Sequence, residues 1–137
     1  MPDRIRPARG LIDTSVVVDL EQIDVTQLPF ELAISSLTLA ELAAGPHAAD
    51  NVVDRARRQD RLQRTEAAFD PLAFDADAAR AYGRIYAATV AVGRKARGPR
   101  AVDLLIAAVA CSAGLPLYTR NVDDFAGLDG LVDVVGV

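Results

Sequence analysis

The sequence predicts an α/β fold in which helices cover both faces of a central, mostly parallel sheet of about five strands. Two observations lead to this prediction. Short apolar segments alternate with longer stretches of helical periodicity along the chain, and no repeat or low-complexity tract interrupts them. The length of 137 residues and the 51% of hydrophobic residues suit one domain with a sizeable core. We therefore expect a single domain over residues 1–137, with residues 1–9 as a short basic N-terminal extension.

The elements follow from the order of these segments. Gly45-Pro46 and Gly114 with Pro116 are expected to end helices. The predicted strands are Leu11–Ile12, Leu32–Ile34, Pro71–Phe74, Pro116–Thr119 and Val132–Val135. The predicted helices are Val16–Leu20, Leu37–Ala44, Ala48–Ala68, Ala76–Val92 and Ala101–Ala113.

Composition and charge exclude several classes of protein. No apolar run approaches the roughly 20 residues of a membrane span, and the basic N-terminus is followed by no long apolar segment typical of a secretory signal. The single cysteine, Cys111, cannot form an internal disulfide. The net charge of −4 argues against a generally basic nucleic-acid-binding surface but allows a local basic patch. We expect a cytoplasmic protein.

Four acidic residues stand where an open parallel sheet forms its sites, in the crevice beyond the C-terminal ends of the strands. Asp13 directly follows the first predicted strand, and Glu41 lies early in the helix after the second. Asp103 lies in the first turn of the helix over 101–113, and Asp124 follows the Pro116–Thr119 strand. We expect all four carboxylates to face one crevice.

Each acid also has a purely structural interpretation. Asp13 suits a helix N-cap, and Thr38 with Glu41 suits a capping box. Asp103 suits the positive end of a helix dipole. The apolar surroundings of Asp103, Val102–Ile106, favour a functional role, because burying an unpaired carboxylate is costly.

The combination of the four acids indicates a metal site. Carboxylates gathered in one cleft repel one another unless they are protonated or bridged by a cation. An all-oxygen site favours Mg²⁺, with Mn²⁺ as a possible substitute, and the only histidine, His47, leaves no ligand set for zinc. Such a site suits the hydrolysis of phosphate esters.

Four segments together resemble the PIN domain in order and spacing: Leu11–Ser15, Thr38–Leu42, Asp103–Ala108 and Thr119–Phe125. The resemblance extends from about Leu11 to Val135, and the size of the chain looks like that of VapC toxins from bacterial toxin–antitoxin pairs. It implies a PIN-like three-layer α/β/α sandwich and a metal-dependent endoribonuclease that cleaves tRNA or rRNA. It also implies a VapB-type antitoxin as partner and a homodimer.

Site roles carry over from this resemblance residue by residue. It implies that Asp13 and Asp103 are the principal Mg²⁺ ligands. Glu41 would be a further ligand, direct or through water, or would orient the attacking water. Thr14 and Thr119 would supply hydroxyls that hold the carboxylates or a water at the metal.

The last acid departs from the simplest family pattern. Some members of the family have an aspartate where this chain has Asn121, and others use the later acid, here Asp124. Asn121 contributes no charge and can alternatively be an N-cap, with Asp124 in the first turn that follows it. We choose Asp124 as the fourth acid and Asn121 as a supporting residue, and we expect Asp123 to be solvated.

Basic residues near the predicted crevice are candidates for binding RNA phosphates. Arg94, Arg97 and Arg100 precede the Asp103 helix in a glycine-containing segment, which is either a mobile RNA-binding loop or an ordinary solvated loop. Arg120 is expected at the mouth of the crevice. A further arginine-rich stretch, 55–64, alternates with acids and is expected to form a salt-bridged exposed helix face.

Two other classes of function compete with the ribonuclease. One is another Mg²⁺-dependent phosphohydrolase, although no glycine-rich Walker loop is present and no Asp-x-Asp motif follows the first strand. The other is a non-catalytic RNA-binding or signalling α/β domain. A receiver-type signalling domain needs a lysine after a late strand, and the only lysine, Lys95, lies in a predicted loop elsewhere.

Overall fold

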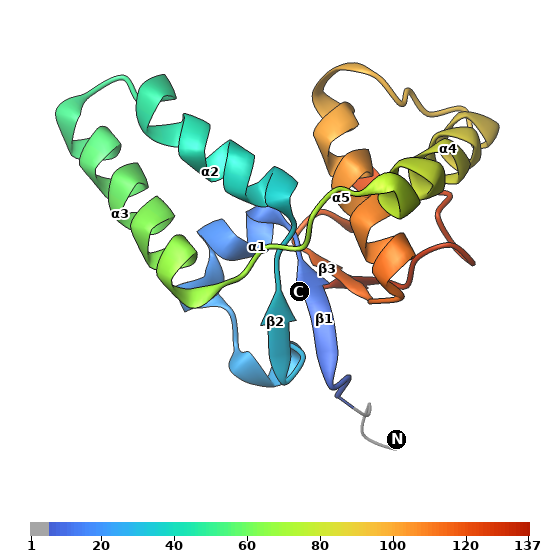
Figure 1. Ribbon diagram of the computed structural model, residues 1–137, viewed down its shortest axis with the longest axis horizontal. Helices are drawn as coiled ribbons and strands as arrows, with labels where there is room; N and C mark the ends of the chain where they lie inside the picture. The colour runs from blue at the N-terminus through green and yellow to red at the C-terminus, as the bar shows by residue number, and fades with distance from the viewer. Residues whose placement is uncertain (1–5) are drawn as a thin grey trace.

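The computed structural model describes residues 6–137, and within them a parallel sheet carries helices on both faces (Figure 1). The sheet has four strands in the described residues, in the order β2-β1-β3-β4. All three neighbouring pairs are parallel. The strands are β1 (Arg9–Ile12), β2 (Glu31–Ala33), β3 (Leu117–Thr119) and β4 (Val134–Gly136). The predicted α/β/α class is confirmed.

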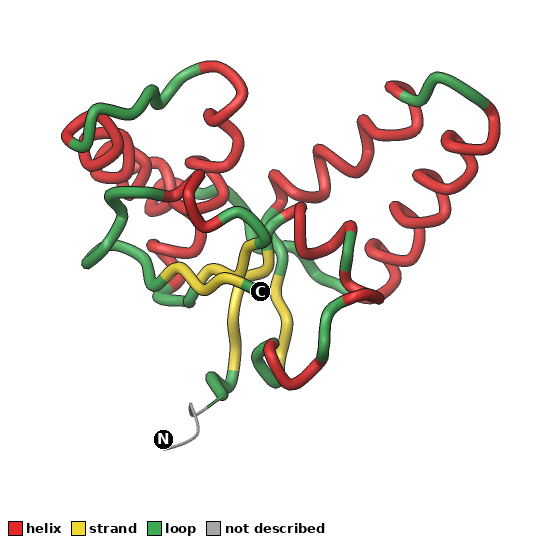
Figure 2. The backbone as a smooth tube through the Cα atoms, turned by 180° about the vertical axis from the view of Figure 1, so that it is seen from behind, coloured by secondary structure: helices red, strands yellow, loops and turns green. Residues whose placement is uncertain are grey.

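The helices form two arms that diverge from the sheet. In Figure 1, α2 and α3 form one arm and α4 and α5 the other, and Figure 2 shows the strands at their junction from behind. No helix between residues 6 and 137 is both long and apolar enough to cross a bilayer. The α-helices are α1 (Thr14–Val18), α2 (Ser36–Ala48), α3 (Val52–Ala68), α4 (Ala76–Ala91) and α5 (Ala101–Ala113); the 3₁₀ helices are η1 (Leu20–Gln22), η2 (Val25–Gln27), η3 (Gly98–Arg100) and η4 (Val122–Phe125).

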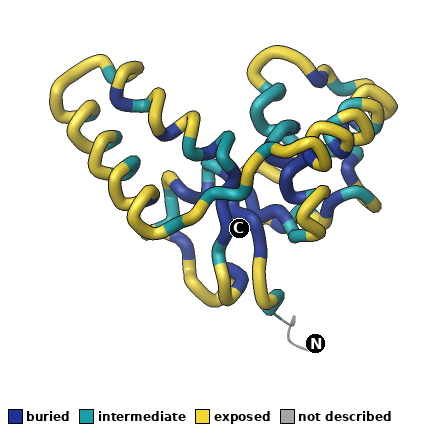
Figure 3. The backbone as a smooth tube through the Cα atoms, viewed as in Figure 1, coloured by how far each residue is buried: buried dark blue, intermediate teal, exposed yellow. Residues whose placement is uncertain are grey.

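Alternation along the strands produces the three layers. Successive strand residues point to opposite faces of a sheet, so Leu11 and Leu117 join the core beneath α4 and α5. Their neighbours Ile12 and Tyr118 join a second core with residues of α1 and α2. Figure 3 shows this burial concentrated in the strands and in α5, whereas most of α3 is exposed. Each face of the sheet therefore has its own apolar layer.

The third predicted strand, Pro71–Phe74, is reduced to a single parallel bridge between Ser35 and Leu72. Leu72 donates its N–H to the carbonyl of Ile34 (2.9 Å) and accepts from the N–H of Ser36 (2.8 Å). Pro71 has no N–H to extend this ladder. This accounts for a sheet of four strands where about five were expected.

The expected helix stop at Gly45-Pro46 is wrong, because α2 continues to Ala48. A proline near the end of a helix removes only one backbone hydrogen bond. Pro46 is buried, and the carbonyl of Gly45 accepts a hydrogen bond from Arg58 Nη1 (3.0 Å). The break comes instead at Asn51, whose side chain caps α3, so the helix predicted over 48–68 begins at Val52.

The second expected stop is confirmed. Helix α5 ends at Gly114, which adopts the left-handed conformation with φ of 67° and donates its N–H to carbonyls of the last turn. Pro116 follows two residues later, immediately before β3. This turn reverses the chain and leads directly into the central part of the sheet.

The predicted N-terminal extension, residues 1–9, is only partly described, and residues 1–5 lie outside the described range. Its last residue, Arg9, already belongs to β1. Arg6 is fixed by three contacts: its Nε donates to the carbonyl of Leu28 (2.8 Å), its Nη2 donates to the carbonyl of Val25 (3.1 Å), and its guanidinium lies 4.0 Å from the ring centre of Phe30. The described part of the extension therefore packs against the chain.

Candidate active site

Asp13 stands at the point where β1 becomes α1. Its N–H donates to the carbonyl of Tyr118 in β3 (3.0 Å), which continues the pairing of the two strands. Its carboxylate accepts the N–H of Val16 (3.1 Å) and the hydroxyl of Ser15 (2.6 Å), so Asp13 is the N-cap of α1. The side chain is nearly buried, with 3% of the residue exposed. Its structural interpretation as a cap is confirmed, and the same contacts fix the orientation of one carboxylate oxygen, Oδ1.

Glu41 reaches the same region from α2. Its Oε1 accepts a hydrogen bond from the Thr14 hydroxyl (2.6 Å), and the hydroxyls of Thr14 and Thr38 are 3.0 Å apart. A carboxylate only accepts, so Thr14 donates to Glu41 and the buried Thr38 donates to Thr14. The predicted capping box of Thr38 and Glu41 is wrong, because Ser35 is the N-cap of α2. Glu41 is therefore free of any capping role.

Asp103 lies in the first turn of α5, half-buried among apolar neighbours. Burial is the largest cause that raises the pKa of Asp103 to about 6. The charges of Asp124, Asp13 and Glu41 add to this rise, in that order, and Arg100 opposes it. Because such influences weaken with distance, Asp124, Asp13 and Glu41 lie close enough to Asp103 for their charges to act on its carboxyl group.

Asp124 lies in η4, in the segment that follows β3, and its charge acts on Asp103. Its Oδ1 lies 3.9 Å from Nη2 of Arg100, and both side chains are partly exposed. Asn121 opens η4, and its side chain makes no capping hydrogen bond, contrary to the N-cap interpretation. The buried Thr119 accepts the N–H of Asn121 through its hydroxyl (3.0 Å). Thr119 thus shapes the turn that presents Asp124.

The chemistry of this donor set fits a hard divalent cation. The four carboxylates come from four different parts of the fold, and the charges of Asp124, Asp13 and Glu41 add to the effect of burial in raising the pKa of Asp103. Within residues 6–137, no three acidic, histidine or cysteine side chains already stand close enough together to hold a metal ion. Glu41 is bonded to Thr14 and Asp124 is paired with Arg100 in this state. Binding of a cation therefore requires these side chains to rearrange.

The four predicted RNA-binding arginines occupy different environments. Arg97 is exposed on the segment between α4 and α5, whereas Arg94 is half-buried and its N–H donates to the carbonyl of Thr89 (3.1 Å). Arg100 is the partner of Asp124. Arg120 is exposed beside the crevice, and its Nε lies 3.5 Å from Oδ2 of Asp19.

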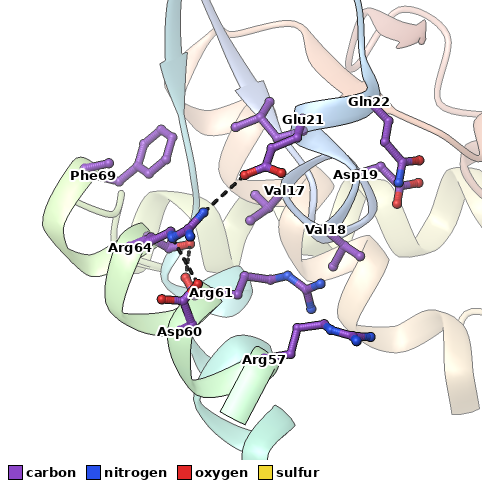
Figure 4. A pocket seen from close by; sticks show the side chains of 13 residues that line it. Val17, Val18, Asp19, Glu21, Gln22, Arg57, Asp60, Arg61, Arg64 and Phe69 are labelled. Atoms are coloured by element: carbon purple, nitrogen blue, oxygen red, sulfur yellow. Dashed lines mark hydrogen bonds and ion pairs between the residues drawn. The ribbon is translucent and has the colours of Figure 1, made fainter. Parts of the chain in front are cut away.

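A groove of about 500 Å³ lies between α3 and the segment from the end of α1 to η1 (Figure 4). The expected salt bridges of the arginine-rich helix face are confirmed at Arg64, which contacts Asp60 (3.0 Å) and Glu21 (3.1 Å). The side chain of Arg61 extends from α3 toward Val18. The groove carries both signs of charge around apolar side chains, so it is not a uniformly basic track for RNA.

Two residues near the acids were not assigned site roles from the sequence. Ser15 donates to Asp13 and accepts the N–H of Arg120 (3.1 Å), which connects α1 to the segment after β3. Thr38 supports Thr14 and, through it, Glu41. Both are hydroxyl residues that lie close in sequence to an acid after a strand, but many residues in such positions only cap helices, so the pattern alone does not indicate a site role.

Known proteins resemble this chain in sequence and in fold. A family model described as the PIN domain matches residues 10–131. Ribonuclease VapC5 of Mycobacterium tuberculosis is 41% identical over 131 residues, which cover 93% of each chain. Ribonuclease VapC1 of Rickettsia felis is 30% identical over 129 residues, 88% of this chain and 91% of the relative.

A solved structure agrees with these sequence relatives. The crystal structure of VapBC-5 from Mycobacterium tuberculosis, a member of the VapBC family of toxin–antitoxin systems, contains a chain with 40% identity and a TM-score of 0.84. The match covers 96% of this chain and all of that chain. The chain therefore belongs to the PIN-domain family and, within it, to the VapC ribonucleases.

Proposed function

We propose that this protein is a metal-dependent endoribonuclease that cleaves tRNA or rRNA and acts as the toxin of a toxin–antitoxin pair. The observation that carries the proposal is the convergence of three other acids on the half-buried Asp103, whose pKa is raised to about 6. Negative charges held close together repel one another, and a cation bound among them removes this repulsion. The all-carboxylate composition of the crevice favours Mg²⁺, or Mn²⁺ in its place.

We assign the four acids different tasks. Asp13 and Asp103 would hold the cation, because Asp13 is fixed by Ser15 and Asp103 lies at the centre of the acidic charge. A divalent cation there would supply positive charge beside the phosphate oxygens and make a water more acidic. Asp124 would add a further negative charge near the cation, once its carboxylate has given up the ion pair with Arg100.

Glu41 is our candidate for orienting the attacking water. Of the described residues only Thr14 hydrogen-bonds to Glu41, through Oε1, so the second carboxylate oxygen is available to accept from water. The attack of water on phosphorus breaks a P–O bond and releases a proton, which an acceptor at this position can take up. Thr14 thus holds the acceptor in place and does not itself exchange the proton.

RNA is the substrate that suits the surroundings of the crevice. The exposed Arg97 and Arg120 and the half-buried Arg94 can contact backbone phosphates despite a net charge of −4 for the whole chain. The relatives are named ribonucleases, and we extend that activity to this chain. We propose tRNA or rRNA as the target, which places the activity in the cytoplasm.

A protein partner is part of this proposal. The solved relative is described as a member of a family of toxin–antitoxin systems, and we propose a VapB-type antitoxin for this chain. Such a partner would cover the acidic crevice, for which a basic side chain is the complementary group. We also propose a homodimer, in line with the family resemblance.

The test is cleavage of total bacterial RNA by purified, antitoxin-free protein with Mg²⁺, with Mn²⁺ and with EDTA. We expect discrete RNA fragments that require the metal. A DNA fragment and a small phosphate ester serve as competing substrates. If the protein cleaves the DNA or the phosphate ester but leaves RNA intact, it is another phosphohydrolase and not a ribonuclease. If folded, metal-loaded protein cleaves none of the three substrates, a binding role is favoured.

A further inference from the structure

Arg100 occupies a singular position among the basic residues of this region. It lies at the junction of η3 and α5, three residues before Asp103. Its side chain is 28% exposed, and its Nη2 is 3.9 Å from Oδ1 of Asp124. The guanidinium thus lies partly buried beside Asp124, whereas Arg97 in the same segment is exposed.

The backbone holds Arg100 in this place. Arg100 is helical in its backbone angles and makes no side-chain hydrogen bond that would cap α5. The preceding segment is attached to the fold by the buried Ala96, which has 4% exposure, and by the bond from Arg94 N–H to the carbonyl of Thr89. The side chain therefore has no capping task of its own, and its described ionic partner is Asp124.

Arg100 places a positive charge next to the acids. The positive charge of Arg100 lies beside Asp124, with 3.9 Å between Nη2 and Oδ1, and three residues before Asp103 in the chain. Within the described residues, Arg100 is the one basic side chain that forms an ion pair with any of the four acids. A divalent cation would interact with the same acids.

We propose that Arg100 is a built-in counter-ion of the acidic crevice, which stabilises the metal-free protein and competes with the divalent cation for Asp124 and Asp103. This inference rests on the metal site of the proposed function. It separates Arg100 from Arg94, Arg97 and Arg120, since its first task is toward the acids and not toward RNA. Arg100 is in this sense a positioning residue that sets the metal concentration at which the site fills.

Removing the charge should tighten metal binding. Two unit charges a few ångströms apart in a solvated crevice interact strongly enough to change an affinity about three- to tenfold. The Arg100→Gln variant should therefore bind Mn²⁺ about three- to tenfold more tightly than the wild type. The same variant should lose about 2 to 5 °C in Tm without metal at low salt, because the acids lose their counter-ion.

The experiment compares wild type, Arg100→Gln, Arg100→Lys and Arg97→Gln, all in the full chain and free of antitoxin. Mn²⁺ affinity is measured by electron paramagnetic resonance of the free ion, and Tm by thermal unfolding in EDTA. We expect Arg100→Lys, which keeps the charge, and Arg97→Gln, which removes an exposed one, to stay within twofold of the wild-type affinity. A general loosening of the fold would weaken metal binding and would not be rescued by lysine.

The outcomes distinguish this inference from the function on which it rests. If the wild type binds Mn²⁺ and Arg100→Gln binds it no more tightly, the counter-ion role is wrong and the metal site stands. Equal tightening by Arg97→Gln would also overturn the inference, because it would show an effect of overall charge. If the wild type binds no Mn²⁺, the proposed metal site and the competition both fall.

Discussion

The hydroxyl of Thr14 lies 2.6 Å from Oε1 of Glu41 and thereby connects the start of α1 to the middle of α2. Thr14 follows directly on Asp13, so one short segment fixes two of the four acids. The hydroxyl of Thr38 lies 3.0 Å from that of Thr14 and hydrogen-bonds to it. The position of Glu41 in the crevice therefore depends on Thr14.

Replacing Thr14 by valine should reduce RNA cleavage about tenfold. A hydrogen bond to a charged group contributes about 1.5–3 kcal/mol, and the lower end applies because Glu41 is exposed. The cleavage rate at saturating Mg²⁺ is the measurement. Thr26→Val is the matched control, since the Thr26 hydroxyl also donates to an acid, Asp24 (2.8 Å), in the exposed η2. An equal loss in both variants would contradict the role of Thr14.

Stability without metal should depend on pH through Asp103. Its pKa of about 6 in the folded protein is above the ordinary value of 3.8, so folding favours the protonated form. The stabilisation is complete below about pH 3.8 and is lost as the pH rises through about 6. The whole change in pKa from 3.8 to about 6 corresponds to about 3 kcal/mol, but solvent screening of the half-buried side chain reduces this to about 1 kcal/mol.

The Asp103→Asn variant tests this dependence, because asparagine stays neutral at every pH. In EDTA at pH 8 we expect it to be more stable than the wild type by about 1 kcal/mol. At pH 4 the two proteins should unfold at the same urea concentration. Asp123→Asn, an exposed neighbour of Asp124, should show no such difference. A variant that is less stable than the wild type at pH 8 would contradict the repulsion among the acids.

Asp124, and not Asn121, should be the fourth residue that activity requires. The charge of Asp124 is the largest electrostatic contribution to the raised pKa of Asp103, whereas the Asn121 side chain is exposed. We expect Asp124→Asn to reduce RNA cleavage at least tenfold and Asn121→Ala to change it less than threefold. Cleavage rates at several Mg²⁺ concentrations provide the comparison. A greater loss in Asn121→Ala would reverse the assignment.

Two glycine substitutions should have opposite effects on stability. Gly114 ends α5 with φ of 67°, and Gly83 lies within α4; neither has an atom within 4 Å of an added Cβ. Gly114→Ala should therefore cost about 1 kcal/mol from backbone conformation alone. Gly83→Ala should stabilise by about 0.5–1 kcal/mol. Urea unfolding measures both, and a stabilised Gly114→Ala would show that this helix end does not need the left-handed conformation.

The fold class was predictable because its signals are local. The apolar segment before Asp13 and the helix over 101–113 depend on periodicity and on Gly114, and both lie where they were predicted. The stop at Pro46 failed because tertiary packing outweighed a local preference. Pro71–Phe74 failed as a strand because its pairing partner offers only one bridge, which no local pattern reveals.

The proximity of the four acids to one another was predictable, because parallel strands bring their C-terminal ends to one edge of the sheet. The contacts that distinguish their tasks were not. The bonds of Ser15 to Asp13 and of Thr14 to Glu41 depend on side-chain directions, which residue spacing does not determine. The ion pair of Arg100 with Asp124 connects a segment that precedes β3 in the sequence to one that follows it. Long-range electrostatics of this kind appears only in three dimensions.

Whether the four acids form one RNA-cleaving site is tested by the single-turnover rate of RNA cleavage in variants that replace each acid by its amide. We expect a loss of at least 100-fold for Asp13→Asn and Asp103→Asn, and of at least tenfold for Glu41→Gln and Asp124→Asn. The doubly substituted Asp13→Asn/Asp103→Asn protein should be little worse than either single variant, because the two acids act as a unit. The exposed-acid control Glu66→Gln should stay within twofold. Wild-type cleavage by folded Asp13→Asn or Asp103→Asn would contradict the account.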